Sequence, residues 1–344
     1  CCFQPGAALM TQTPERSKPR GLTLACAAGL LVTALLNGKT VVSATTIEHW
    51  TTQEGLAVHY VHSDSVPLLD LILGFDAGSA LDGDAPGLAR LTAGLIGEGA
   101  GNLDADAISR RFDDAAARFD ASSGRDQSSV QLRSLVEPDA LTAAIDTLAL
   151  TVGSPSVPAD ALERVRSSAL TSVQRAARDP NAVARDRLWQ VLYPEHPYGQ
   201  PPGGTEAALT AITRETVLDF HRRYYTAANA SLTLVGAIDR TQAESIARQL
   251  AAALPQGPAP LPVPTPSRTV SEQTIGIRMP GNQTVVLRGA LGYARGDERH
   301  EALTVVNQML GGGGLGSRLL QALREERGLS YGAGSGFLPM RHPG

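Results

Sequence analysis

The sequence contains almost no cysteine and few aromatic residues. Its three cysteines, Cys1, Cys2 and Cys26, all lie within the first 26 of 344 residues. The remainder of the chain therefore has no disulfide and no cysteine metal ligand. Aromatic side chains make up 4% of the residues, whereas hydrophobic residues make up 42%, much of this alanine, leucine and valine. Such a composition favours helices packed on a sheet over an aromatic-rich β-sandwich.

An excess of positive charge and the common nucleotide and nucleophile motifs are also missing. The formal net charge is -4, and no basic stripe is present that could neutralise the phosphates of a nucleic acid. The patterns G-x-x-x-x-G-K-[ST], G-x-S-x-G and C-x-x-C do not occur. The glycine run 311–314 lacks the lysine of a phosphate-binding loop. We interpret it as a helix end where two backbone segments pass closely.

The histidines do not have the spacing of a zinc site. Neither H-E-x-x-H nor H-x-x-E-H occurs. His59 and His62 are three residues apart in a predicted strand, so their side chains face opposite sides of it. We interpret them as surface or edge residues. His196, His221 and His300 are isolated in the sequence and give no better indication of a metal site.

Residues 1–44 are typical of an export signal. Three basic residues, at positions 16, 18 and 20, precede an apolar run over residues 21–36. Small residues close the segment at Val42-Ser43-Ala44. This order predicts a signal peptide cleaved after Ala44 and a periplasmic or secreted protein. An uncleaved N-terminal membrane anchor is the alternative.

Hydrophobic periodicity predicts an α+β domain over residues 45–254. Strands are expected at residues 55–63, 66–75 and 231–235 and within 120–136. Helices are expected at residues 86–97, 104–119, 138–152, 158–192 (broken or bent at Asp179-Pro180), 213–225 and 240–254.

A proline-rich linker, residues 255–267, separates this domain from a second one. The pattern then restarts over residues 268–344, with strands expected at 274–279 and 284–293 and a helix at 298–310. This repetition of the order strand, strand, helix predicts two homologous domains, each a mostly antiparallel sheet covered by helices. The second copy is much shorter than the first, so we expect it to be truncated.

The stretch SRLLQALREERGLSYG, residues 317–332, predicts a helix ended by Gly328. Tyr331 would then lie on an extended segment, with its hydroxyl able to turn back toward Arg324. This stretch resembles the second-domain motif of insulinase-like (pitrilysin-type) zinc metallopeptidases. Long collinear matches, such as the one that begins at Phe75 (FDAGSALDGDAPGLARLTAGLIGEG), extend the resemblance over nearly all of the chain after the leader.

The resemblance also marks the places of a zinc site that this chain does not retain. The three functional positions of the family's H-x-x-E-H motif fall at Arg90, Ala93 and Gly94. The family's downstream glutamate ligand falls at Thr171-Ser172, of which we assign Ser172. None of these side chains can ligate zinc or accept a proton at neutral pH. We therefore expect the chain to bind no metal or other cofactor and to be inactive alone.

In that family, an arginine and a tyrosine seven positions later reach the active site of the other half of the molecule. Here the pair is Arg324 and Tyr331. The resemblance implies the non-catalytic subunit of a heterodimer, whose homologous H-x-x-E-H partner holds zinc and whose substrate is an unfolded peptide. Two alternatives stay open: a peptide-binding or scaffold protein with no role in proteolysis, and an active peptidase with an unusual metal site.

Overall fold

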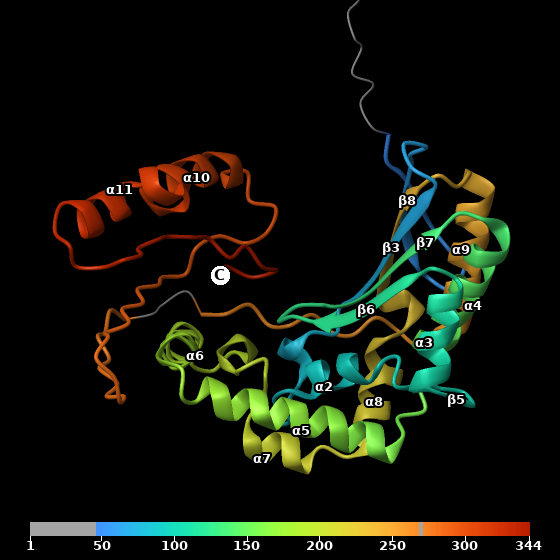
Figure 1. The fold of residues 1–344 in the computed structure, drawn as a ribbon, viewed down its shortest axis with the longest axis horizontal. Coiled ribbons are helices and arrows are strands. Elements are labelled where there is room, and N and C mark those ends of the chain that lie inside the picture. Colours follow the sequence, from blue (N-terminus) through green and yellow to red (C-terminus); the bar gives the residue numbers. More distant parts are fainter. Residues whose placement is uncertain (1–45, 268–270) are drawn as a thin grey trace, which may run out of the picture. The chain divides into compact units, whose positions relative to one another are not determined.

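The computed structural model describes residues 46–267 and 271–344 (Figure 1). The predicted signal peptide lies outside these residues. In the described part of the chain, no helix is long and apolar enough to span a bilayer.

Six strands form one mixed sheet in the order β1-β2-β8-β3-β7-β6. All neighbours are antiparallel except β2 and β8, which are parallel. A separate two-stranded ladder joins β4 and β5. The prediction of a mostly antiparallel sheet in an α+β fold is confirmed. The strands are β1 (Glu48–Thr51), β2 (Ala57–His62), β3 (Leu68–Phe75), β4 (Gly99–Ala100), β5 (Leu103–Asp104), β6 (Arg118–Ser123), β7 (Ser128–Leu135) and β8 (Ala230–Gly236).

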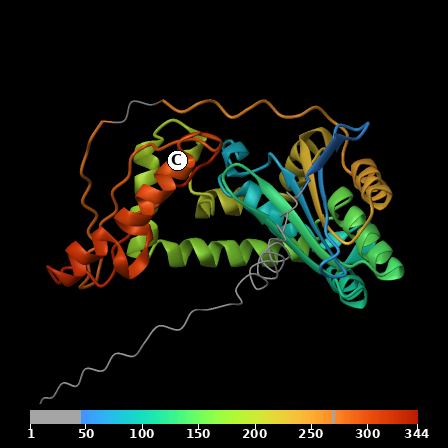
Figure 2. The ribbon, with the colours of Figure 1, turned by 90° about the horizontal axis from the view of Figure 1, so that it is seen from above.

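One face of the six-stranded sheet is buried and the other is open. Along β3, Leu69, Leu71 and Leu73 are at most 1% exposed, whereas Ile72 between them is 43% exposed. Side chains alternate between the faces of a strand, so every second residue enters the core. Figures 1 and 2 show α3, α4 and α9 grouped on the same side of the sheet.

Local signals fix where the helices of the first domain begin. The carboxylate of Asp104 accepts a hydrogen bond from the backbone of Ala107 at 2.8 Å and caps α3. At Asp179-Pro180 the chain breaks as predicted, because Asp179 caps a new helix and Pro180 occupies its first turn. The helices are α2 (Leu88–Leu95), α3 (Ala105–Asp114), α4 (Pro138–Gly153), α5 (Ala159–Ala176), α6 (Pro180–Leu192), α7 (Glu206–Ala211), α8 (Arg214–Tyr224) and α9 (Arg240–Ala253).

The helix predicted over residues 104–119 is too long. It ends at Asp114, and Ala116 has a left-handed backbone with φ of 49°. Phe119 instead pairs with Leu132 in the β6–β7 ladder. The helical preference of the alanine-rich sequence is therefore overridden by strand pairing. The short elements β1 and α7 were not predicted.

The two strands predicted at residues 274–279 and 284–293 are not formed. Both segments lack a ladder partner in the described part of the chain, and Ile277 and Val286 are 46% and 82% exposed. A strand requires a neighbour that pairs its N–H and C=O groups. The helix predictions hold, because α10 (His300–Asn307) and α11 (Arg318–Leu320) each continue into a π-helical turn, at 308–312 and 321–325.

Candidate functional site

Helix α2 carries three of the four predicted zinc-site positions, and its start is held by a buried carboxylate. Asp82 is 5% exposed and accepts hydrogen bonds from the backbone N–H groups of Gly87 at 2.7 Å and Ala89 at 2.8 Å. Burial raises the pKa of Asp82 to about 7, although the two backbone hydrogen bonds favour the charged form. Gly87 has φ of 99°, and a Cβ there would lie 2.8 Å from the Cα of Gly204. The loop before α7 therefore packs closely against the first turn of α2.

The predicted positions on α2 do not form a ligand set. Six of its eight residues are buried, and the two exposed ones are Arg90 and Gly94. They are one helical turn apart and share a face. Ala93 is 3% exposed and contributes to the core. The two positions predicted to correspond to histidine ligands thus face solvent, while the one predicted to correspond to the general base holds a buried methyl group.

Arg90 and Gly94 form an exposed strip on α2, and two neighbouring segments border it. A Cβ built on Gly94 would lie 3.2 Å from Cγ1 of Val165 on α5, and one on Gly203 would lie 3.9 Å from Nη1 of Arg90. Helix α5 therefore runs along one side of the strip, and the glycine loop 203–204 lies against Arg90.

The fourth predicted position, Ser172, lies on α5 two turns after Val165 and on the same side of that helix. Its hydroxyl donates a hydrogen bond to the carbonyl of Ser168 at 2.9 Å. The hydroxyl of Thr171 donates in the same way to Ser167, also at 2.9 Å. Both hydroxyls are thus engaged with their own helix.

The residues at these four positions do not fit a zinc ion. Zinc in proteins is bound by thiolates, imidazoles and carboxylates. The positions hold a guanidinium, a methyl group, a glycine and a hydroxyl. In residues 46–267 and 271–344, no three His, Cys, Asp or Glu side chains lie close enough to hold a metal ion.

The two histidines of β2 lie in different surroundings. His59 is exposed and pairs in register with His49 of β1. His62 places Nδ1 2.9 Å from the carbonyl oxygen of Ile238. They do not converge on one site.

The other histidines highlighted by the sequence bind neighbouring groups. His196 donates from Nε2 to the carbonyl of Pro264 at 2.6 Å. His221 is 2% exposed and donates from Nε2 to the carbonyl of Val152 at 2.8 Å, which joins α8 to the end of α4. Burial lowers the pKa of His221 to about 4, so its ring is neutral at physiological pH. Nδ1 of His300 lies 2.9 Å from a tyrosine hydroxyl.

Arg324 and Tyr331 lie next to each other, and the contact is made by the tyrosine ring, not by the hydroxyl that was predicted to turn toward Arg324. The guanidinium carbon of Arg324 is 4.8 Å from the centroid of the Tyr331 ring, a cation–π distance. Gly328 has φ of 60°, and its N–H donates to the carbonyl of Arg324 at 3.0 Å. The helix therefore ends there and the chain turns back. Tyr331 is 88% exposed.

One buried cluster was missed by sequence reasoning. The guanidinium carbon of Arg125 lies 3.8 Å from the ring centroid of Trp189, and Nη1 donates to the carbonyls of Tyr198 at 2.7 Å and Gln200 at 2.9 Å. The hydroxyl of Tyr198 donates to Asp126. Burial lowers the pKa of Arg125 to about 10, so it stays charged. These contacts fasten the β6–β7 turn to residues 189–200.

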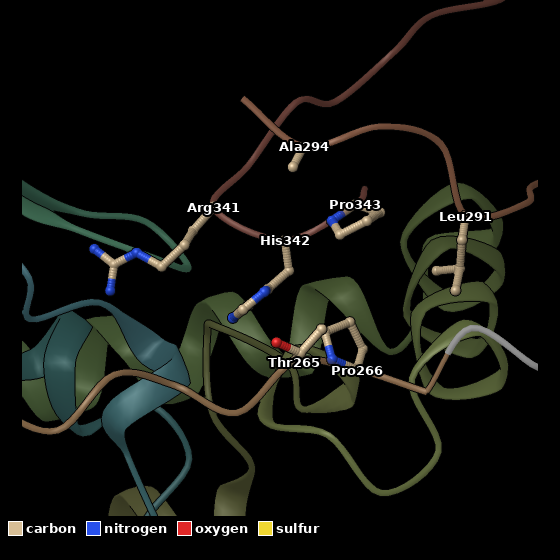
Figure 3. A pocket seen from close by; sticks show the side chains of 7 residues that line it. All are labelled: Thr265, Pro266, Leu291, Ala294, Arg341, His342 and Pro343. Carbon is tan, nitrogen blue, oxygen red and sulfur yellow. The ribbon is translucent and has the colours of Figure 1, made fainter. Parts of the chain in front are cut away.

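A pocket of about 310 Å³ lies between the linker and the last residues of the chain (Figure 3). None of the predicted site positions lines it. The imidazole Nε2 of His342 donates to the carbonyl of Val263 at 3.0 Å, so this ring is already occupied. The lining residues are Thr265, Pro266, Leu291, Ala294, Arg341, His342 and Pro343.

Comparison with known proteins gives consistent matches. Residues 58–206 match the family model "Insulinase (Peptidase family M16)", and residues 211–344 match "Peptidase M16 inactive domain". The crystal structure of a peptidase M16 inactive domain from Pseudomonas fluorescens is 37% identical, with a TM-score of 0.82 over 87% of this chain and 72% of that one. A protease from Helicobacter pylori shares the fold at 19% identity, with a TM-score of 0.72 over 86% of this chain and 72% of that one.

Curated relatives match only part of their own length. An uncharacterised zinc protease of Mycobacterium leprae is 31% identical over 195 residues, which are 56% of this chain and 43% of the relative. The chain spans about half the length of the curated relatives it matches.

Proposed function

The chain belongs to the M16 (insulinase) family of peptidases but lacks the family's zinc-binding motif, and we propose that it is the non-catalytic subunit of a heterodimeric zinc metallopeptidase. One observation carries this proposal: Arg324 and Tyr331 are retained side by side, while none of the three assigned ligand positions holds a zinc ligand and the assigned general-base position holds alanine. A homologous subunit with an H-x-x-E-H motif would supply the zinc ion. The substrate would be an unfolded peptide.

The chemistry of the pair suits a peptide carbonyl. Zinc bound by the partner would supply an activated water, and attack by that water places negative charge on the carbonyl oxygen of the peptide. A guanidinium and a phenol are strong hydrogen-bond donors to such an oxygen. Lysine at position 324 would lack the planar fork of donors and should replace arginine poorly.

An edge of the sheet offers a place for the peptide backbone. Strand β6 is last in the sheet order and pairs only with β7. Its outer N–H and C=O groups therefore have no partner strand in the sheet, and an extended peptide can add to them.

Mutation of the pair tests the proposal in the mixed complex. The chain is purified with its H-x-x-E-H homologue, and cleavage of an unfolded peptide is followed. We expect the double variant Arg324→Ala with Tyr331→Ala to lower kcat by about 100- to 1000-fold, as loss of oxyanion stabilisation does. Assembly, measured by size-exclusion chromatography, should not change.

Arg327→Ala is the matched control, because this exposed arginine lies near the same helix end outside the pair. It should leave kcat within about twofold. Unchanged turnover of the double variant would support the scaffold alternative. Robust zinc-dependent cleavage by the isolated chain would contradict the whole proposal.

We further propose that the protein is exported to the periplasm or secreted. The basic, apolar and small-residue order of residues 1–44 supports this, as does the lack of cysteine after position 26. N-terminal sequencing of the protein recovered from the periplasm or the medium should begin at residue 45. An intact leader on membrane-bound protein would instead indicate the anchored alternative.

A further inference from the structure

We infer that Arg90 makes the former zinc position a binding site for a peptide carboxylate, either a free C-terminus or a Glu or Asp side chain. The inference rests on the proposed function, because it assumes an extended peptide on β6. It gives a function to the exposed face of α2, where the zinc ligands of the family are missing.

The first support is that the site is still open. Every residue of α2 is buried except Arg90 and Gly94, the two positions where the family holds its histidine ligands. A large side chain at position 94 could have covered the strip beside Arg90. Gly94 leaves it open instead, with Val165 at its border.

The second support is that the guanidinium of Arg90 is free. Arg90 is the only charged residue of α2, and within the described residues its side chain forms no ion pair or hydrogen bond. Nearby arginines differ: Arg164 pairs with Glu98 at 2.7 Å, and Arg166 donates to the carbonyl of Leu209 at 3.0 Å.

Three acidic groups on or near α2 and α5 already have partners. Glu98 is held by Arg164, and Glu163 is held by Arg166. Both carboxylate oxygens of Asp82 accept backbone N–H groups at the start of α2. An unpaired positive charge therefore remains at the strip, and a carboxylate can pair with a guanidinium through two parallel hydrogen bonds.

The third support is the position of α2 beside β6 (Figure 1). Before α2, the backbone N–H groups of Ser79 and Ala80 donate to the β6–β7 turn, both at 2.9 Å. After α2, a Cβ on Gly97 would lie 3.0 Å from the ring of Phe119, near the start of β6. The helix and the strand thus run side by side in opposite directions. A peptide paired with the free edge of β6 would pass the exposed strip of α2.

Peptide binding to the full-length purified chain tests the inference. One fluorescently labelled extended peptide without acidic residues is used with a free C-terminus and with an amidated C-terminus. A third version is amidated and carries one internal glutamate. Fluorescence anisotropy should show that wild type binds at least one carboxylate-bearing version about tenfold more tightly than the neutral version. The version that gains affinity identifies the source of the carboxylate.

Arg90→Gln should remove that preference and leave binding of the neutral peptide unchanged. Arg110→Gln is the control, because it removes the same charge from an exposed, unpaired position on α3. It should keep the preference, and circular dichroism should show that both variants fold. Equal wild-type affinity for all three peptides, or equal losses in both variants, would overturn the inference without touching the Arg324–Tyr331 test. Failure of wild type to bind any of the peptides would overturn both the inference and peptide binding by this chain.

Discussion

Asp82 and His221 are buried ionisable residues whose effects on stability have opposite dependence on pH. The pKa of Asp82 is raised from 3.8 to about 7, so the folded protein binds this proton more tightly than the unfolded chain does. Its contribution to stability therefore falls as pH rises from about 4 to about 7. The pKa of His221 is lowered from 6.5 to about 4, so the folded protein binds that proton less tightly. Its contribution is complete above about 6.5 and is lost as pH falls toward 4.

Separate substitutions should reveal these two slopes. In wild type, the ionisation of Asp82 should lower the free energy of unfolding by on the order of 3 kcal/mol between pH 4 and 7. Asp82→Asn keeps one carbonyl oxygen for a backbone N–H but cannot ionise, so this decrease should be absent in the variant. In wild type, deprotonation of His221 should raise the free energy of unfolding by on the order of 3 kcal/mol between pH 4 and 6.5. His221→Gln keeps a donor for the carbonyl of Val152 but does not titrate, so this increase should be absent in the variant. Urea unfolding at several pH values measures both. Slopes that change in the same direction in the two variants would show that the assignment is wrong.

Among the elements, those with signals inside their own sequence were predictable. Strand β3 alternates buried and open positions, and α9 begins at a capping box formed by Asp239 and Gln242. Such signals act over a few residues, so the sequence alone indicates the type and approximate ends of these elements.

Elements that depend on distant partners were predicted less well. The end of α3 depends on pairing of Phe119 with Leu132, which the alanine-rich sequence does not reveal. Segments 274–279 and 284–293 have the composition of strands, yet composition supplies no neighbour to pair with. Arg125 reaches the carbonyl of Tyr198, 73 residues away, and no local pattern specifies that contact.

In the candidate site, too, some features follow from local sequence signals and others depend on contacts with distant elements. Proximity of Arg324 and Tyr331 follows from a helix stopped by Gly328, which is a local signal. The sequence and its family resemblance also located Arg90 and Gly94. That these two alone remain exposed depends on how neighbouring elements bury the rest of α2, and this required the structure.

At the scale of the whole molecule, the proposal divides one active site between two chains. In this proposal the chain would contribute Arg324 and Tyr331 as donors for the peptide carbonyl, and Arg90 on α2 as an exposed positive charge. The zinc ion and the general base would come from the partner. Neither chain would then hold a complete set of catalytic groups, so activity would require assembly.

Metal content tests this division directly. We expect the mixed complex to retain one zinc ion per heterodimer after dialysis and the isolated chain to retain none, measured by elemental analysis. The physical reason is that Arg90, Ala93, Gly94 and Ser172 offer no thiolate, imidazole or carboxylate to a metal. Replacing the first histidine of the partner's motif with alanine should remove the zinc from the complex without preventing assembly. Tightly bound, stoichiometric zinc on the isolated chain would mean that the metal site lies within this chain after all, and the Arg324–Tyr331 pair would then have to act within one subunit.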